Sequence, residues 1–259
     1  MGTLYFLGTC SGTEPIEGMH HTSTVLEIDG RLYWIDAGET CSYTAHRMGL
    51  PLLSTRAIFL SHMHIDHIGG LANLFFCFWK LISRGFAKGM IDNELDILSP
   101  KPDVVNSIQK IGCDGRTADD VFAFPVRNTK TEDGVIYEDA RVRVTALHNT
   151  HLHEDGSNGW HAYSFLVETE GKRLVFSGDV GEIKELTPLV KDGCDLLVME
   201  TGHHKVADIC DYAREYALPR VILTHHGREI INGREAVQTH LAQCGRDIRL
   251  AYDGMTETI

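Results

Sequence analysis

The sequence predicts an α/β protein built from two similar halves, because two strand motifs recur in the same order. In the first motif, an apolar strand closes in Asp-x-Gly, over 31–38 and again over 173–181. In the second, an apolar strand closes in a hydroxyl residue followed by a histidine, over 56–62 and 220–225. If the halves pack sheet against sheet, as layered domains do, their strand ends meet in one shared cleft.

The repeat divides the chain into halves of about 1–135 and 136–259. Each Asp-x-Gly strand follows another strand across a turn, which contains Asp-Gly at 29–30 and Glu-Gly at 170–171. An acidic residue and a glycine between apolar runs predict a β-hairpin. A length of 259 residues fits one large domain. We therefore expect both halves to form a single domain over 1–259.

Helices are predicted where apolar residues recur with helical spacing. The end of the predicted helix 183–190 is not fixed, because Pro188 interrupts helical hydrogen bonding. The stretch 129–138 is polar and contains Gly134, so we expect a surface connection there. The predicted helices cover 70–83, 104–111, 183–190, 206–216 and 234–244.

Composition favours a cytoplasmic protein that does not contact a membrane. The seven cysteines are odd in number and lack a C-x-x-C pair, which indicates free thiols rather than a disulfide framework. The N-terminal residues read as a strand rather than as a signal peptide. The longest apolar run, 71–79, is too short to span a bilayer. The net charge of −12 argues against a broad phosphate-binding surface for extended nucleic acid.

The most informative segment is His62-Met63-His64-Ile65-Asp66-His67, which follows the apolar strand 57–60. A single histidine at a strand end is usually a surface residue. Three imidazoles and a carboxylate within six residues favour a metal centre instead. Imidazole and carboxylate ligands suit zinc first, while manganese or iron would fit the same ligands.

The spacing H-x-H-x-D-H resembles the signature of the metallo-β-lactamase superfamily, and the resemblance extends over nearly the whole chain. Further motifs of that family follow in the expected order. The similarity is greatest to the ribonuclease Z-like and phosphodiesterase-like branches, and it implies a four-layer αββα sandwich. The motifs are those at 7–13, 35–39, 62–67, 177–179 and 224–225, with a glutamate at Glu200.

The resemblance also implies a binuclear metal site. One divalent ion would be held by His62, His64 and His151. The second would be held by Asp66, His67 and His225, and Asp179 would bridge the two ions. Zinc is the expected metal for both positions.

The third ligand of the first ion is open between two histidines. The family pattern places it a few residues beyond the strand 141–147, which favours His151, with His148 as the alternative. His153 and His161 are expected to line the pocket or to face solvent. Two further residues are not expected to be ligands. Asp36 is expected to orient a ligand histidine, and His226 is expected either to contact substrate or to be exposed.

Two close metal ions predict a hydrolase in which a metal-bridging hydroxide is the nucleophile. The leaving group then needs a proton. Asp66 could ligate metal and handle that proton. Glu200 with His203 could fill the same role, since ribonuclease Z-like relatives have a glutamate in a similar position that works with a histidine. The alternative is a surface turn that carries polar residues.

The leading hypothesis is a hydrolase of a small phosphodiester or related ester. Only 28 positions separate His151 from Asp179 (179 − 151), which leaves no room for the RNA-gripping arm of the RNA-processing relatives. A lactone or thioester hydrolase is the next enzyme hypothesis, followed by a ribonuclease Z-like nuclease. A metal-binding protein without catalysis belongs to a different class. The sequence does not decide whether the chain forms a homodimer.

Overall fold

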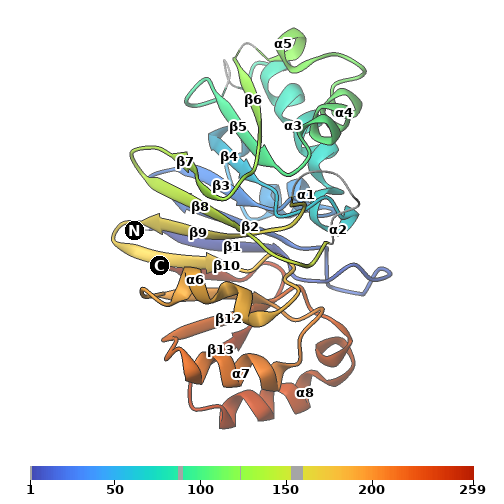
Figure 1. The fold of residues 1–259 in the computed structure, drawn as a ribbon. Helices are drawn as coiled ribbons and strands as arrows, with labels where there is room; N and C mark the ends of the chain where they lie inside the picture. The colour runs from blue at the N-terminus through green and yellow to red at the C-terminus, as the bar shows by residue number, and fades with distance from the viewer. Residues whose placement is uncertain (1, 87–89, 123, 153–159) are drawn as a thin grey trace.

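The protein folds into two mixed β-sheets that face each other, with helices on both outer sides (Figure 1). The structure is a computed structural model and describes residues 2–86, 90–122, 124–152 and 160–259. Each sheet has seven strands within this part of the chain. The first sheet has the order β14-β1-β2-β3-β4-β5-β6 and the second β13-β12-β11-β10-β9-β8-β7.

The strands of the first sheet are β1 (Thr3–Gly8), β2 (Ser23–Ile28), β3 (Arg31–Ile35), β4 (Thr55–Phe59), β5 (Leu95–Ser99), β6 (Val126–Lys130) and β14 (Thr256–Thr258). Those of the second are β7 (Gly134–Glu138), β8 (Val142–His148), β9 (Tyr163–Thr169), β10 (Lys172–Phe176), β11 (Leu196–Glu200), β12 (Arg220–Thr224) and β13 (Asp247–Leu250). The helices are α1 (Cys41–Arg47), η1 (Leu52–Ser54), α2 (Ile65–Ile68), α3 (Leu71–Ser83), α4 (Pro102–Gly112), α5 (Ala118–Val121), η2 (Ile183–Leu186), α6 (Thr187–Val190), α7 (Val206–Glu215) and α8 (Arg228–Gln243).

Three apolar cores hold the layers together. The first lies between the first sheet and helices α1, α3 and α4, and includes Trp34, Phe75 and Phe78. The second lies between the two sheets and includes Phe59 and Phe165, whose ring centroids are 6.2 Å apart. The third packs α6, α7 and α8 on the outer face of the second sheet. The predicted four-layer αββα sandwich is therefore confirmed.

The two sheets repeat one strand pattern, which corrects part of the predicted repeat. From β14 and from β7, each sheet runs through three antiparallel pairings and then three parallel ones. Asp36 follows β3 and Asp179 follows β10, so these aspartates occupy equivalent places as predicted. The predicted match of His62 with His225 is wrong, because His62 follows β4, whose equivalent is β11, whereas His225 follows β12.

Local structure differs from the prediction in two places. The stretch 129–138, predicted as a surface connection, contains the end of β6 and all of β7, two edge strands in which few side chains are buried. The last helix begins at Arg228 rather than at residue 234. Gly233 has non-helical dihedral angles (φ −143°, ψ 33°), and this kink breaks the periodicity that the prediction used.

The stretch Ile65–Ser83 is long and apolar enough to cross a membrane by length and composition alone. Its side chains Leu71, Leu74, Phe75 and Phe78 are fully buried in the core under the first sheet. The packing of these side chains is that of a core helix.

Candidate metal centre

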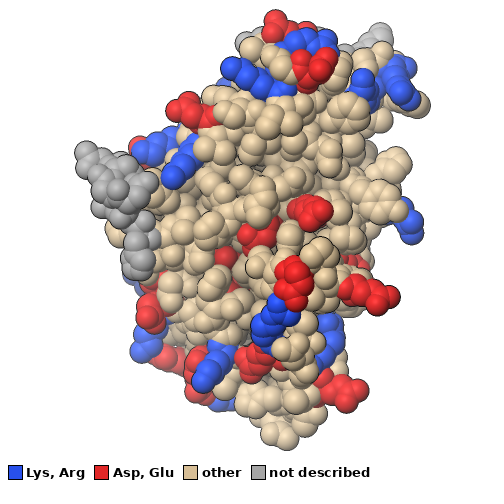
Figure 2. All heavy atoms as spheres, turned by 90° about the vertical axis from the view of Figure 1, so that its right-hand side faces the viewer, with Lys and Arg blue, Asp and Glu red and all other residues tan. Residues whose placement is uncertain are grey.

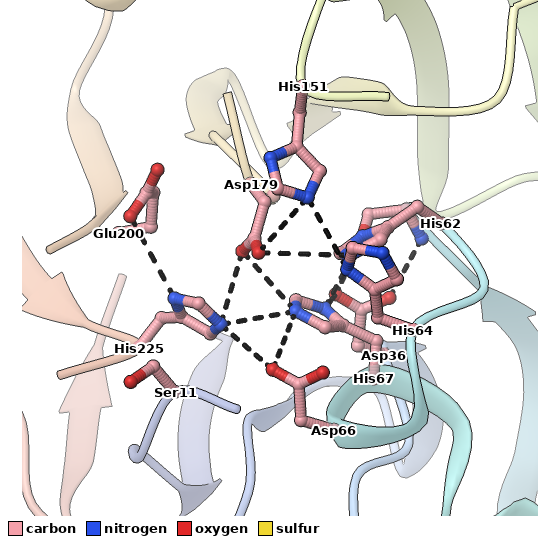
Figure 3. A network of polar contacts seen from close by, with 12 residues as sticks. Ser11, Asp36, His62, His64, Asp66, His67, His151, Asp179, Glu200 and His225 are labelled. Carbon is pink, nitrogen blue, oxygen red and sulfur yellow. Dashed lines mark hydrogen bonds and ion pairs between the residues drawn. The ribbon is translucent and has the colours of Figure 1, made fainter. Parts of the chain in front are cut away.

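The predicted ligands converge at one edge of the sandwich, where strands of both sheets end. His62 follows β4 and begins the segment that leads into α2, which carries Asp66 and His67. Asp179 follows β10 and His225 follows β12. Figure 3 shows Asp179 in the middle of this group, between His151 and the imidazoles of both sheets. Residues from both halves therefore face one another across the space between the sheets.

The first ligand group contains His62, His64, His151 and Asp179, with one donor atom from each within 4.8 Å of the others. His62 Nε2 lies 3.0 Å from His64 Nδ1. Asp179 Oδ2 lies 3.7 Å from His62 Nε2 and 3.6 Å from His151 Nε2. These separations are those of atoms that surround a common point.

The second ligand group contains Asp66, His67, Asp179 and His225, all of them buried. His225 Nε2 lies 3.1 Å from Asp66 Oδ2 and 3.3 Å from Asp179 Oδ1. His67 Nε2 is 3.3 Å from the same Asp179 oxygen. Asp179 thus directs Oδ2 at the first group and Oδ1 at the second.

The donor set fits two divalent cations that share Asp179. Its Oδ1 is buried and has no hydrogen-bond partner, although a buried oxygen without a partner costs free energy. The Nε2 atoms of His67 and His225 face each other 3.3 Å apart, and each lies 3.3 Å from the same Asp179 oxygen. A cation between these nitrogens and carboxylates satisfies all of them, and the ligand types are those that zinc takes.

Asp36 holds the candidate ligand His67 in place through a hydrogen bond to its ring. Asp36 Oδ2 accepts a hydrogen bond from His67 Nδ1 at 2.7 Å and another from Ser61 Oγ at 2.8 Å. Its Oδ1 accepts the backbone N–H of Ser61 at 2.7 Å. Because Nδ1 is used in this way, His67 presents Nε2 to the ligand group. Asp36 (φ 59°) and His225 (φ 50°) both adopt the left-handed backbone region, a strain that is common at functional sites.

Burial and charge act in opposite directions on the histidines. Burial lowers the pKa of His62 well below its usual value. Burial also disfavours protonation of His67 and His225, but neighbouring carboxylates, Asp179 foremost, outweigh it. The pKa of His67 is therefore raised well above 6.5, and that of His225 to about 9. The carboxylates that would help to hold a cation therefore also favour the protonated form of these two imidazoles.

Glu200 and His203 form a pair beside the ligand groups. His203 Nδ1 donates to Glu200 Oε1 at 3.0 Å, and the His203 backbone N–H donates to Oε2 at 2.9 Å. Glu200 is buried, while the His203 side chain is 43% exposed. The hydrogen bond to Glu200 raises the pKa of His203 above 6.5. Burial raises the pKa of Glu200, but its hydrogen bonds outweigh this and lower the value.

The remaining histidines lie apart from the ligand groups. His148 donates to Asp133 at 2.6 Å and stacks on Trp160, with ring centroids 3.9 Å apart, so the structure brings His151 rather than His148 to the ligands. His226 is buried with Nε2 2.9 Å from the Ala251 carbonyl oxygen, which excludes both substrate contact and exposure. His161 is half-buried and belongs to neither ligand group. The prediction for His153 falls outside the described residues.

Known proteins resemble this chain in sequence and in fold. Residues 2–241 match the family described as Anti-Pycsar protein Apyc1. The chain belongs to this family. A ribonuclease Z of Shouchella clausii (strain KSM-K16) is 26% identical over 281 residues, covering 86% of each chain. Other ribonuclease Z relatives are matched over 22% to 53% of their own length.

Two solved structures share the fold of this Apyc1-family chain. The metallo-β-lactamase fold protein YhfI from Bacillus subtilis has a TM-score of 0.76 at 16% identity, covering 100% of both chains. Zn²⁺-bound PqqB from Methylobacterium extorquens has a TM-score of 0.70 at 13% identity, covering 99% of this chain and 100% of that one. The Apyc1-family chain is thus a metal-dependent hydrolase with the metallo-β-lactamase fold, and it is similar in sequence to ribonuclease Z.

In this Apyc1-family chain, the ligand groups open into a cleft of about 560 Å³. Its walls include eight residues that the sequence analysis did not select as site residues. Two glycines are required by close approach: a Cβ on Gly12 would lie 3.0 Å from the Asp66 carboxylate, and one on Gly202 would lie 2.7 Å from His225 Nδ1. The eight residues are Ser11, Gly12, Thr13, His21, Ile65, Gly202, Gly227 and Arg228. The motif at 7–13 was the available signal for the first three.

Proposed function

We propose that this protein is a binuclear metal-dependent phosphodiesterase that hydrolyses a small phosphodiester. The observation that carries the proposal is the pair of ligand groups that share Asp179, with Glu200 and His203 at the rim of the same cleft. Divalent ions bound here, zinc by preference, would generate hydroxide from water near neutral pH and offset phosphate charge. A site that already contains several carboxylates needs such cations before an anionic substrate can enter.

The chain's own residues supply the remaining steps. His203 is the candidate acid: it faces the cleft, and Glu200 fixes its Nδ1 and favours its protonated form. The P–O ester bond breaks as water oxygen bonds to phosphorus, and His203 Nε2 gives the departing oxygen its proton. Asp66 acts as a metal ligand in this scheme, since it faces His225 inside the second group.

The size and charge of the cleft support a small substrate. Among the described residues that line it, Arg228 is the only Lys or Arg. Figure 2 shows one face of the molecule, on which blue side chains gather towards the two ends and form no continuous basic tract. An extended RNA backbone needs several cations along its path. A single phosphodiester needs only the metal ions and one or two donors.

RNA cleavage is the second candidate, because the curated relatives are named ribonuclease Z. The chain covers 86% of the Shouchella clausii relative, so the resemblance extends well beyond the metal motifs. A nuclease and a small-molecule phosphodiesterase would use the same ligand groups, and substrate size separates them. Lactone or thioester hydrolysis would use the same ions without a phosphate.

The test is turnover by zinc-loaded protein on a matched set of substrates. We expect hydrolysis of bis(p-nitrophenyl) phosphate and of cyclic mononucleotides, with loss of activity in His64→Ala together with the bound metal. Cleavage of a transfer RNA precursor without turnover of these compounds would favour the nuclease. Turnover confined to lactones or thioesters would overturn the phosphodiester assignment.

A further inference from the structure

Arg228 occupies an unusual position at the cleft. It is the first residue of α8, and its side chain lines the cleft that contains His64, Asp179 and His203. The start of the helix is fixed against the loop that carries His203, since a Cβ on Gly227 would lie 2.9 Å from the Gly202 Cα. The backbone of Arg228 is therefore held beside the Glu200–His203 pair, while its side chain is 52% exposed.

The guanidinium of Arg228 is paired with Glu14, on the loop that connects β1 and β2. Both side chains are exposed, at 52% and 60%. An exposed ion pair contributes little to stability, because both charges are well solvated without each other. The pair can therefore exchange its carboxylate for another anion at low cost. Arginine suits this exchange, since its planar fork binds phosphate through two parallel hydrogen bonds.

We propose that Arg228 is a specificity-determining residue that binds a non-bridging oxygen of the substrate's phosphate. In the absence of substrate, the guanidinium is paired with the Glu14 carboxylate, and the phosphate displaces that carboxylate when substrate binds. This assignment rests on the proposed phosphodiesterase function. Arg228 gives the cleft its selectivity for anionic esters, because the other cleft-lining residues in the described part of the chain are neutral, acidic or histidine. Glu14 acts as a competitor, so its removal strengthens substrate binding.

Four variants of the zinc-loaded protein test the assignment. Arg228→Ala removes the hydrogen-bond donor to the phosphate. Arg228→Lys keeps the positive charge but loses the planar guanidinium, and Glu14→Gln removes the competing carboxylate charge. Arg143→Ala is the matched control, because Arg143 pairs with Glu138 on the surface at similar exposures of 48% and 57%. The measurements are kcat and KM for bis(p-nitrophenyl) phosphate, the affinity for inorganic phosphate by calorimetry, and the metal content.

We expect Arg228→Ala to raise KM and weaken phosphate binding about tenfold, which is the effect of one charge-assisted hydrogen-bonded contact. Arg228→Lys should fall between it and wild type, Glu14→Gln should lower KM, and Arg143→Ala should match wild type, all with normal metal content. A KM and phosphate affinity within twofold of wild type in Arg228→Ala would overturn the assignment. Equal increases in KM for Arg228→Ala and Glu14→Gln would overturn it too, because they indicate a structural latch.

The phosphate titration separates this assignment from the proposed function. If wild-type protein binds phosphate but turns over no phosphodiester, the proposed function fails. The phosphate affinities of wild type and the Arg228 variants then still test the assignment. If metal-loaded wild type binds no phosphate, the assignment fails whatever the turnover.

Discussion

Asp36 and Asp179 occupy equivalent places in the two sheets and yet have different surroundings. Each follows the last strand of a hairpin, β3 or β10, at the edge where the sheets meet. Asp36 accepts three hydrogen bonds from Ser61 and His67, so its carboxylate is fully used inside the protein. Asp179 Oδ1 has no hydrogen-bond partner and lies 3.3 Å from the Nε2 atoms of His67 and His225. A repeated scaffold thus supports an orienting aspartate on one side and a candidate bridging ligand on the other.

The largest effect is expected from Asp179→Asn. The substitution replaces the carboxylate, whose two oxygens face the two ligand groups, by an amide with one neutral oxygen and one NH₂ group. Binding of both candidate ions is therefore weakened. We expect kcat for bis(p-nitrophenyl) phosphate to fall about a thousandfold, the upper range for loss of one electrostatic group in an active site. If Asp179→Asn retained more than a tenth of wild-type activity, Asp179 would not be a ligand shared by the two candidate ions.

His203→Ala should lower kcat about a hundredfold while metal content stays normal, because proton transfer to a leaving group contributes on that scale. The loss should shrink for a substrate with an acidic leaving group such as p-nitrophenol, which departs without a proton. Steady-state kinetics on p-nitrophenyl and alkyl phosphodiesters check this. Equal losses on both substrates would contradict the acid role.

Asp36→Asn should weaken zinc binding by 10- to 100-fold, the usual cost of removing a partner that orients a ligand histidine. The effect is smaller than that of Asp179→Asn because the ligand His67 itself remains. Competition with a chelator of known affinity measures it. His148→Ala is the control: His148 contacts Asp133 and Trp160 outside both groups, and zinc affinity should not change.

Metal binding should release protons at neutral pH, the smallest of the four effects. The neighbouring carboxylates raise the pKa of His67 and of His225, which favours protonated imidazoles before metal binds, and metal takes only the neutral imidazole. Release should diminish as pH rises towards about 9, where His225 is already partly neutral. Calorimetry of zinc binding in two buffers with different ionisation enthalpies counts the protons. A binding enthalpy independent of buffer would contradict this.

Much of this arrangement could be predicted from the sequence because the relevant signals are local. The segment 62–67 places four candidate ligands within six residues, and its neighbours repeat recognisable strand ends. The preference for His151 over His148 came from the family resemblance, which places the ligand a few residues beyond the strand 141–147. The error in matching His62 with His225 arose because similar strand endings occur on β4 and β12, and only hydrogen bonding between strands shows which are equivalent.

The walls of the cleft could not be predicted, because they depend on contacts between distant segments. Arg228 reaches Glu14 across 214 positions, and His226 is buried against Ala251 and Thr9. The start of α8 was missed because Gly233 interrupts its periodicity. The contacts of Arg228 with Glu14 and of His226 with Thr9 join the two halves, and such contacts leave no pattern within a short window of sequence.

The most direct test of the account is the number of zinc ions that metal-free protein binds, measured by calorimetric titration of wild type and Asp179→Asn. Two ligand groups that share Asp179 predict two equivalents per chain in wild type and weakened binding of both in the variant. One equivalent in wild type, or two that persist with unchanged affinity in Asp179→Asn, would contradict a shared binuclear centre.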